Sequence, residues 1–211
     1  MRSRIAIIFA ILIIGTIAAT IMMQDLNNID ITVHTNGSNV EVKSYSPFYI
    51  APHQMDVEME EAAMEQLVEP NSTVASIKNE IKSIAKNYNY TATVTLISPY
   101  GIDQLPMPAK VNGTSMLPTL KNGQEIIVLK TKDYKVNDIV VAMHPDYGMI
   151  VKRLKVIDPD KVYLMSDNRN IEYYTTQKTL GNGLVEYDTY KKTPLDTWLP
   201  KENVIGVVKI Y

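Results

Sequence analysis

The chain has 211 residues, of which 45% are hydrophobic and 21% charged, and this average composition excludes a largely disordered protein. The net charge is −2, so bulk electrostatics do not favour nucleic acid as a partner. Cysteine is absent, which excludes disulfide scaffolds, cysteine nucleophiles and thiolate metal sites. The histidines, His34, His53 and His144, are too scattered for a metal cluster. We therefore expect neither a metal nor an organic cofactor.

An apolar segment lies at the N-terminus, where Ile5 to Met23 are nineteen consecutive residues without a charge. A helix of this length spans about 28 Å, close to the ~30 Å hydrocarbon core of a bilayer. Arg2 and Arg4 precede the segment, so the positive-inside rule keeps the N-terminus cytoplasmic. We expect a retained, single-pass membrane anchor in the lipid bilayer, followed by an extracytoplasmic chain. A cleavable secretory signal is the main alternative.

The rest of the chain divides by charge. Residues 24–110 hold 11 acidic and 5 basic side chains, whereas residues 111–211 hold 12 and 14. We predict three parts: the cytoplasmic N-terminus and anchor over 1–24, an acidic extracytoplasmic region over 25–108, and a β-rich domain over 109–211.

The acidic region contains two predicted helices. Asp56 to Glu69 is rich in Met, Ala and Glu and stops at Pro70, and Asn71 to Thr73 offers N-caps for a second helix. Apolar residues then recur at helical spacing, at Val74, Ile77, Ile81, Ile84 and Tyr88. This spacing favours a packing stripe over a face that binds a partner. Thr91 to Ile97 alternates as a β-strand does.

Beyond residue 109 the sequence predicts a mainly β fold. Short β-branched runs are separated by turn residues, at Gln124–Leu129, Ile139–Met143, Met149–Val156, Lys161–Met165 and Val204–Ile210. Helix and strand do not alternate, which excludes a doubly wound fold. Residues 170–197 are polar and tyrosine-rich, and we expect a long irregular excursion from the sheet.

Ser115 is a candidate nucleophile. It follows a glycine turn at Gly113 and precedes Pro118, and tight backbone there would expose the hydroxyl and aim N–H groups outward. A hydrolase site also needs a base and donors for the oxyanion. Alone, a serine in a turn is far more often structural than catalytic.

Lys152 is the candidate base. If residues 149–154 form a strand, Lys152 shares a face with Ile150 and Leu154, while Val151, Arg153 and Lys155 lie on the other. Burial can lower a lysine pKa by several units from its usual ~10.4, and a neutral lysine can take a serine proton. The guanidinium of Arg153 stays protonated and cannot. The alternative is an edge-strand lysine whose charged head reaches water.

A third element, Tyr163 to Arg169, is a strand that ends in a polar turn. Its structural alternative is an ordinary turn in which Asp167 and Asn168 bond their own backbone.

Together, and in this order behind an apolar N-terminus, these pieces resemble type I signal peptidases, the serine–lysine membrane proteases of a wider family that includes self-cleaving repressors. The similar segments are Gly113–Leu120, Val136–Val141, Ile150–Arg153, Ser166–Arg169, and Trp198–Pro200 with Asn203–Gly206. They span the chain from residue 109 to its end, with a gap at 170–197. The resemblance implies a coiled β-sheet catalytic domain, behind a transmembrane helix and a small helical insert.

The resemblance also implies roles. Ser115 would be the nucleophile, with its backbone N–H in the oxyanion hole, and Lys152 the general base. Ser166, Asp167, Asn168 and Arg169 would support them, and Val111, Met116, Leu120, Ile150 and Val151 would line shallow substrate pockets. The implied partners are exported pre-proteins bearing signal peptides, and the chemistry needs no cofactor.

Two departures from the family pattern matter. The family's glycine before Asp-Asn is Ser166, and residues 170–176 lack its usual Asp-Asn-Ser pattern. The hydroxyl that orients the lysine is therefore open among Ser166, Thr175 and Thr176.

Other functions stay open at this point. His144 is the rival base, though Lys152 fills the base position of the motif. A non-catalytic anchored domain that binds peptides or partners is one alternative, and a dedicated processing protease for surface or pilus subunits is another. A self-cleaving repressor is disfavoured because no helix-turn-helix precedes the β-rich half.

Overall fold

The computed structural model describes residues 27–181, 184–192 and 194–210. The predicted anchor at 5–23 lies outside these residues. Within the described ranges, no helix is both long and apolar enough to cross a membrane. The chain divides into two compact units that meet in sequence between Leu105 and Pro106.

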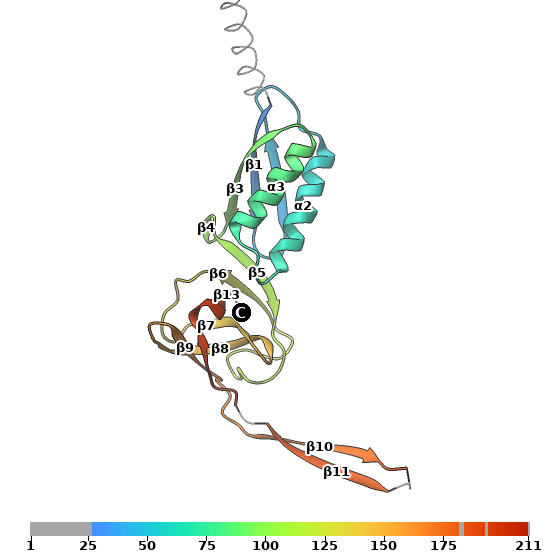
Figure 1. Ribbon diagram of the computed structural model, residues 1–211, viewed down its shortest axis with the longest axis vertical. Helices are drawn as coiled ribbons and strands as arrows, with labels where there is room; N and C mark the ends of the chain where they lie inside the picture. The colour runs from blue at the N-terminus through green and yellow to red at the C-terminus, as the bar shows by residue number, and fades with distance from the viewer. Residues whose placement is uncertain (1–26, 182–183, 193, 211) are drawn as a thin grey trace, which may run out of the picture. The chain divides into compact units, whose positions relative to one another are not determined.

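The first unit is built on a four-stranded sheet in the order β2-β1-β3-β4. Its strands are β1 (Asn28–Thr35), β2 (Val40–Tyr45), β3 (Thr91–Ser98) and β4 (Gly101–Ile102). β1 pairs with β3 in parallel and with β2 antiparallel. Two helices, α2 (His53–Val68) and α3 (Val74–Asn87), connect β2 to β3 and lie on one face of this sheet (Figure 1).

Both predicted helices are confirmed. α3 begins after Thr73, whose hydroxyl accepts the Ser76 N–H at 3.0 Å while the Ser76 hydroxyl accepts the Thr73 N–H. This reciprocal pair satisfies two N–H groups that the helix end would otherwise leave unpaired. Ile77 and Ile81 are fully buried, and Val74, Ile84 and Tyr88 pack partly buried against the same core. The apolar stripe is therefore a packing face, as predicted.

The description of this region as a helical insert was incomplete, because β1 and β2 were not predicted. Ile29, Ile31 and Val33 are each no more than 2% exposed and alternate with polar residues along β1. That period of two is a usable strand signal. The first unit is thus a sheet with two helices packed on it, rather than helices alone.

The second unit contains a seven-stranded sheet in the order β12-β9-β8-β7-β13-β6-β5. The strands are β5 (Leu105–Lys110), β6 (Glu125–Lys130), β7 (Ile139–His144), β8 (Gly148–Ile157), β9 (Lys161–Met165), β12 (Thr197–Pro200) and β13 (Val204–Ile210), with the 3₁₀ turn η1 (Lys201–Asn203) before β13. All five strands predicted for this half are present. The described chain is mainly β with two α-helices.

Residues 170–197 are not irregular, which corrects the prediction. β10 (Glu172–Thr179) and β11 (Val185–Lys192) pair antiparallel as a sheet of their own. Tyr174 lies opposite Tyr190 and Thr175 opposite Thr189, and such cross-strand pairs of aromatic and β-branched residues stabilise a hairpin. The polarity of the segment reflects two solvent-exposed faces.

Both faces of the seven-stranded sheet are covered near its centre. Val140 and Ala142 of β7 belong to one apolar cluster, and Ile139 and Val141 belong to another. Successive side chains of a strand point to opposite faces, so β7 reads as a continuous apolar run. β8 pairs with this buried strand, which places the middle of β8 in an apolar environment.

Candidate active site

Ser115 lies in a closed loop, residues 111–124, between β5 and β6. The backbone of Val111 closes its base by donating to the Gln124 carbonyl and accepting from the Gly123 N–H, each at 2.8 Å. Inside the loop the Gly113 N–H donates to Asn122 Oδ1 at 2.7 Å. Gly113 has a φ of +96°, which a residue with a side chain rarely adopts. These contacts hold Ser115, two residues later, in a defined position.

Lys152 meets this serine from the middle of β8. Its Nζ donates to Ser115 Oγ at 2.8 Å. Lys152 is only 4% exposed, with Ile150 and Leu154 buried on the same face of the strand and Val140 opposite it on β7. The predicted face of β8 is confirmed, and the hydroxyl and amine lie within the reach that proton transfer requires.

Arg153, the next residue, binds a carboxylate. Its Nε and Nη2 donate to Asp167 Oδ1 and Oδ2 at 2.7 and 2.5 Å, and its Nη1 donates to the Asn137 carbonyl at 2.8 Å. Asp167 also accepts the Thr119 hydroxyl at 2.6 Å. Hydrogen bonds from Arg153 lower the pKa of Asp167; partial burial opposes this, and the Thr119 bond adds to it. Asp167 thus ties β8 to the far part of the Ser115 loop.

Asn168 holds the backbone around the serine. Its backbone N–H donates to the Ser115 carbonyl at 2.9 Å, and its side-chain amide donates to the Thr114 carbonyl at 3.0 Å. Its Oδ1 also accepts the Asn170 N–H, so the expected local turn bond exists beside the long-range ones. The polar turn after β9 therefore does more than close a turn, because it fixes two consecutive peptide groups at the serine.

Ser166 and Arg169 bind Leu195 and Asp196, the two residues that precede β12. The buried Ser166 donates its hydroxyl to the Leu195 carbonyl at 3.0 Å and its N–H to Asp196 at 3.1 Å. Arg169 Nη1 lies 2.8 Å from both carboxylate oxygens of Asp196. The other two candidate hydroxyls, Thr175 and Thr176, are exposed on β10.

A cavity of about 550 Å³ opens at Ser115 and Lys152. Of the residues predicted to line it, Val111, Ile150 and Val151 do so. Met116 and Leu120 do not, because they point into the apolar core of the unit and are at most 1% exposed. The lining that the sequence analysis missed is Ala109, Lys110, Asn112, Gly113, Thr114, Ile126, Val141, Tyr147, Met149, Pro194 and Leu195. Met149 has the same parity as Val151, which the predicted strand over 149–156 already indicated, whereas Tyr147 lies in the turn before β8.

His144, the alternative candidate base, forms structural contacts in the turn between β7 and β8. Its Nδ1 accepts the Asp146 N–H at 3.1 Å, and its ring centroid lies 4.8 Å from that of Tyr147. The buried imidazole therefore closes the turn between β7 and β8, while Lys152 is the group on the serine hydroxyl. In the described part of the chain, no three His, Asp or Glu side chains gather as a metal site would require.

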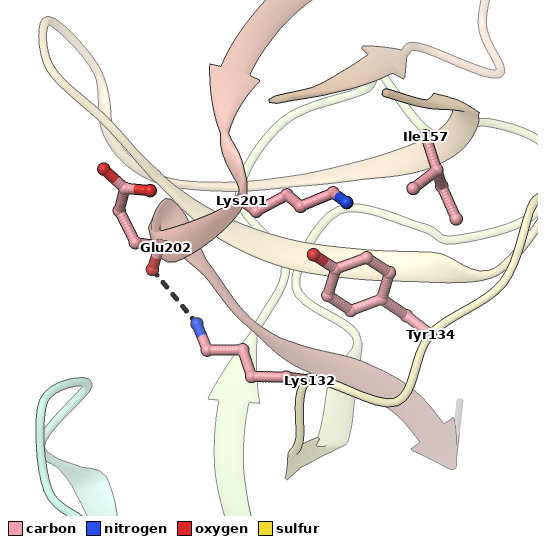
Figure 2. Close-up of a pocket in the computed structure, with 5 residues that line it drawn as sticks. All are labelled: Lys132, Tyr134, Ile157, Lys201 and Glu202. Atoms are coloured by element: carbon pink, nitrogen blue, oxygen red, sulfur yellow. Dashed lines mark hydrogen bonds between the residues drawn. The ribbon is translucent and has the colours of Figure 1, made fainter. Parts of the chain in front are cut away.

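A second, smaller cavity of about 380 Å³ lies at Lys132, Tyr134, Ile157, Lys201 and Glu202 (Figure 2). Lys132 Nζ donates to the Glu202 carbonyl at 3.0 Å and also to the Val204 carbonyl. Burial lowers the pKa of Lys132, against the opposing charge of Glu202, and raises the pKa of Tyr134. Lys132 therefore binds the backbone around η1. The Ser115 cavity is the better candidate for chemistry, because it is there that an amine contacts a serine hydroxyl.

The contact between Lys152 and Ser115 has the geometry that a serine-peptidase site requires. A family model described as Peptidase S24-like matches residues 84–182, slightly less than half of the chain. The matched segment contains Ser115, Lys152 and the turn 166–169. It supports an S24-like domain, the fold of a serine peptidase or of a self-cleaving protein. No curated protein and no solved structure matches the chain significantly.

Proposed function

We propose that this protein is a membrane-anchored serine endopeptidase that removes signal peptides from exported pre-proteins. The observation that carries the proposal is the 2.8 Å contact between Lys152 Nζ and Ser115 Oγ, two residues that line an open cavity. The S24-like match supports the peptidase class, and the apolar N-terminal segment supports the choice of substrate.

The chemistry follows from two groups. Ser115 attacks the scissile carbonyl while neutral Lys152 takes its proton and then passes that proton to the leaving amine. Water, activated by the same lysine, releases the acyl-enzyme. The Ser115 N–H contributes to the oxyanion hole, and the Asn168 bonds to the Thr114 and Ser115 carbonyls hold this backbone in place.

The cavity suits a peptide with small apolar side chains. Val111, Ile150, Val151, Met149 and Leu195 give it apolar walls beside the reacting pair. A substrate bound as an extended strand would place alternate side chains, at positions −1 and −3, toward these walls. Such residues are typical of the end of a signal peptide.

The anchor would supply proximity, because enzyme and substrate then diffuse in the same plane. It also places the peptidase domain outside the cytoplasm by the positive-inside rule. The acidic first unit has no part in the proposed chemistry.

The test is cleavage of a purified pre-protein by the full chain in detergent or vesicles. We expect wild type to release the mature protein and both Ser115→Ala and Lys152→Ala to be inactive. Lys155→Ala is the matched control, because this neighbouring lysine lies on the other face of β8. An inert wild type, under conditions where a bacterial signal peptidase cuts, would favour a non-catalytic binding domain. Cleavage of surface or pilus subunits only would indicate a dedicated processing protease.

The pH dependence gives a second test of the same chemistry. Only the neutral amine can accept the serine proton, and the ordinary lysine pKa is ~10.4. Cleavage should therefore rise from pH 6 toward pH 10. A flat profile over that range would argue against a lysine base.

A further inference from the structure

The connection between β2 and α2 in the first unit, residues 46–52, exposes apolar side chains to an unusual degree. Ile50 is 97% exposed, Phe48 58% and Tyr49 46%, and Tyr45 at the end of β2 is 65% exposed. The segment reads Ser-Pro-Phe-Tyr-Ile-Ala-Pro and carries no charge. Contiguous exposed apolar residues of this kind mark a contact surface rather than ordinary solvent-facing loop.

The strand register places this loop at a particular end of the sheet. Tyr45 lies opposite Asp30, near the start of β1, and β2 runs antiparallel to β1. The chain beyond Tyr45 therefore continues toward the end of the sheet where β1 begins, as the β2–α2 connection in Figure 1 shows. At the opposite end, the turn between β1 and β2 is Asn36-Gly-Ser-Asn39, which is polar. One end of this hairpin is apolar and the other is not.

The apolar end is the one tied to the predicted anchor. The uncharged run ends at Met23 and β1 begins at Asn28, so five residue steps separate them. An extended chain of that length reaches at most about 18 Å. The headgroup region adds about 5–8 Å to each side of the hydrocarbon core. With the proposed anchor in the bilayer, this short connection would keep the start of β1 within about 18 Å of the end of the anchor, and so close to the membrane surface.

We infer that residues 45–50 insert into the lipid headgroup region of the same bilayer that holds the anchor. Phe, Tyr and Ile are suited to this layer, and tyrosine is enriched there. Pro47 and Pro52 restrict the loop, so less conformational freedom is lost on insertion. Because the loop has no basic residue, the contact depends on buried apolar surface and not on anionic lipid. The inference rests on the proposed anchor and is independent of the proposed peptidase chemistry.

The natural absence of cysteine makes a site-directed test clean. Ile50→Cys in the full chain is labelled with an environment-sensitive fluorophore and reconstituted in neutral phosphatidylcholine vesicles. Ser38→Cys, exposed in the polar turn, is the matched control, and Ala10→Cys within the apolar run reports on the anchor. The readouts are quenching by brominated lipid and by aqueous iodide.

We expect the label at position 50 to be quenched several-fold more by brominated lipid than the label at 38, with the reverse order for iodide. Adding anionic lipid or salt should leave this difference unchanged. If the labels at 50 and 38 behave alike while the label at 10 is quenched by lipid, the loop contact is wrong and the anchor stands. If the label at 10 is also unquenched, both the anchor and the loop contact are overturned.

Discussion

Lys152 and Arg153 are adjacent basic residues on β8, and their side chains meet different chemistry on opposite faces of the strand. Lys152 contacts the Ser115 hydroxyl in a buried apolar setting, whereas Arg153 forms a bidentate salt bridge with the Asp167 carboxylate. A carboxylate stabilises a cation, while apolar burial disfavours it. Arg153 could not act as a base on either face, because its guanidinium stays protonated. The position of Lys152 on the strand is what places a group that can lose its proton in the apolar setting beside Ser115.

The largest expected effect comes from removing the amine while keeping the shape of the side chain. Lys152→Met should lower cleavage by about 10³-fold or more, since general-base catalysis typically contributes about 10²–10⁴-fold. A buried methionine fits among Ile150 and Leu154, so the fold should persist, as circular dichroism would show. Retention of a tenth of the wild-type rate would contradict the role of the lysine.

Arg153→Lys tests the other face. Lysine keeps the charge but cannot form both bonds to Asp167 at once, so we expect a loss of about 1–2 kcal/mol in unfolding free energy. Cleavage should fall less than tenfold at temperatures where the protein stays folded. Denaturant unfolding measures the first quantity. A rate loss as large as that of Lys152→Met would mean that the two faces are not functionally distinct.

Asn168→Ala removes the side-chain bond to the Thr114 carbonyl but keeps the backbone bond to the Ser115 carbonyl. We expect a rate loss of about tenfold, because the nucleophile and its N–H would be held less firmly. The loss should appear in kcat more than in KM. An Asn170→Ala control leaves the side chain of Asn168 in place and should cleave normally.

Replacing Asp167 should have a smaller effect, on folding stability, and this effect should depend on pH. Its folded-state pKa lies below the ordinary value of 3.8, mainly because of Arg153. A lowered folded pKa adds stability that is fully present above the unfolded pKa and is lost as the pH falls through the folded one. Wild type should therefore exceed Asp167→Asn in stability at pH 6, and the gap should shrink below about pH 4. If the difference in unfolding free energy between wild type and Asp167→Asn is the same at pH 3 and pH 6, the ion pair does not contribute to stability as described.

Sequence periodicity predicted which face of a strand each site residue occupies, but not which residues distant in sequence meet. The alternation along β8 placed Lys152 and Arg153 on opposite faces, and α3 followed from its cap and apolar stripe. Pairing Ser115 with Lys152 rested on the family resemblance, since spacing alone does not bring residues 37 positions apart together. The bonds from Asn168 to Ser115 and Thr114 span 53 and 54 positions and arise from tertiary folding. Met116 and Leu120 were predicted to line the cavity because they are close to Ser115 in sequence. That prediction is wrong, since closeness in sequence does not show which way a loop side chain points.

Parts of the fold were missed for other reasons. β1 carried a clear alternation that the acidic composition of its region obscured. The β10–β11 hairpin has two exposed faces, so no apolar period marked it, and only its β-branched and tyrosine content favoured strands.

The most direct test of the central claim is chemical rescue of the base. Lys152→Cys would introduce the only cysteine of the chain, and alkylation with bromoethylamine would restore an amine at nearly the lysine position. Alkylation with iodoacetamide adds a group of similar size without a basic amine. The account predicts that Lys152→Cys is inactive, that aminoethylation restores pre-protein cleavage, and that carbamidomethylation does not. Wild-type cleavage by unmodified Lys152→Cys, or no recovery in a folded and fully aminoethylated protein, would contradict it.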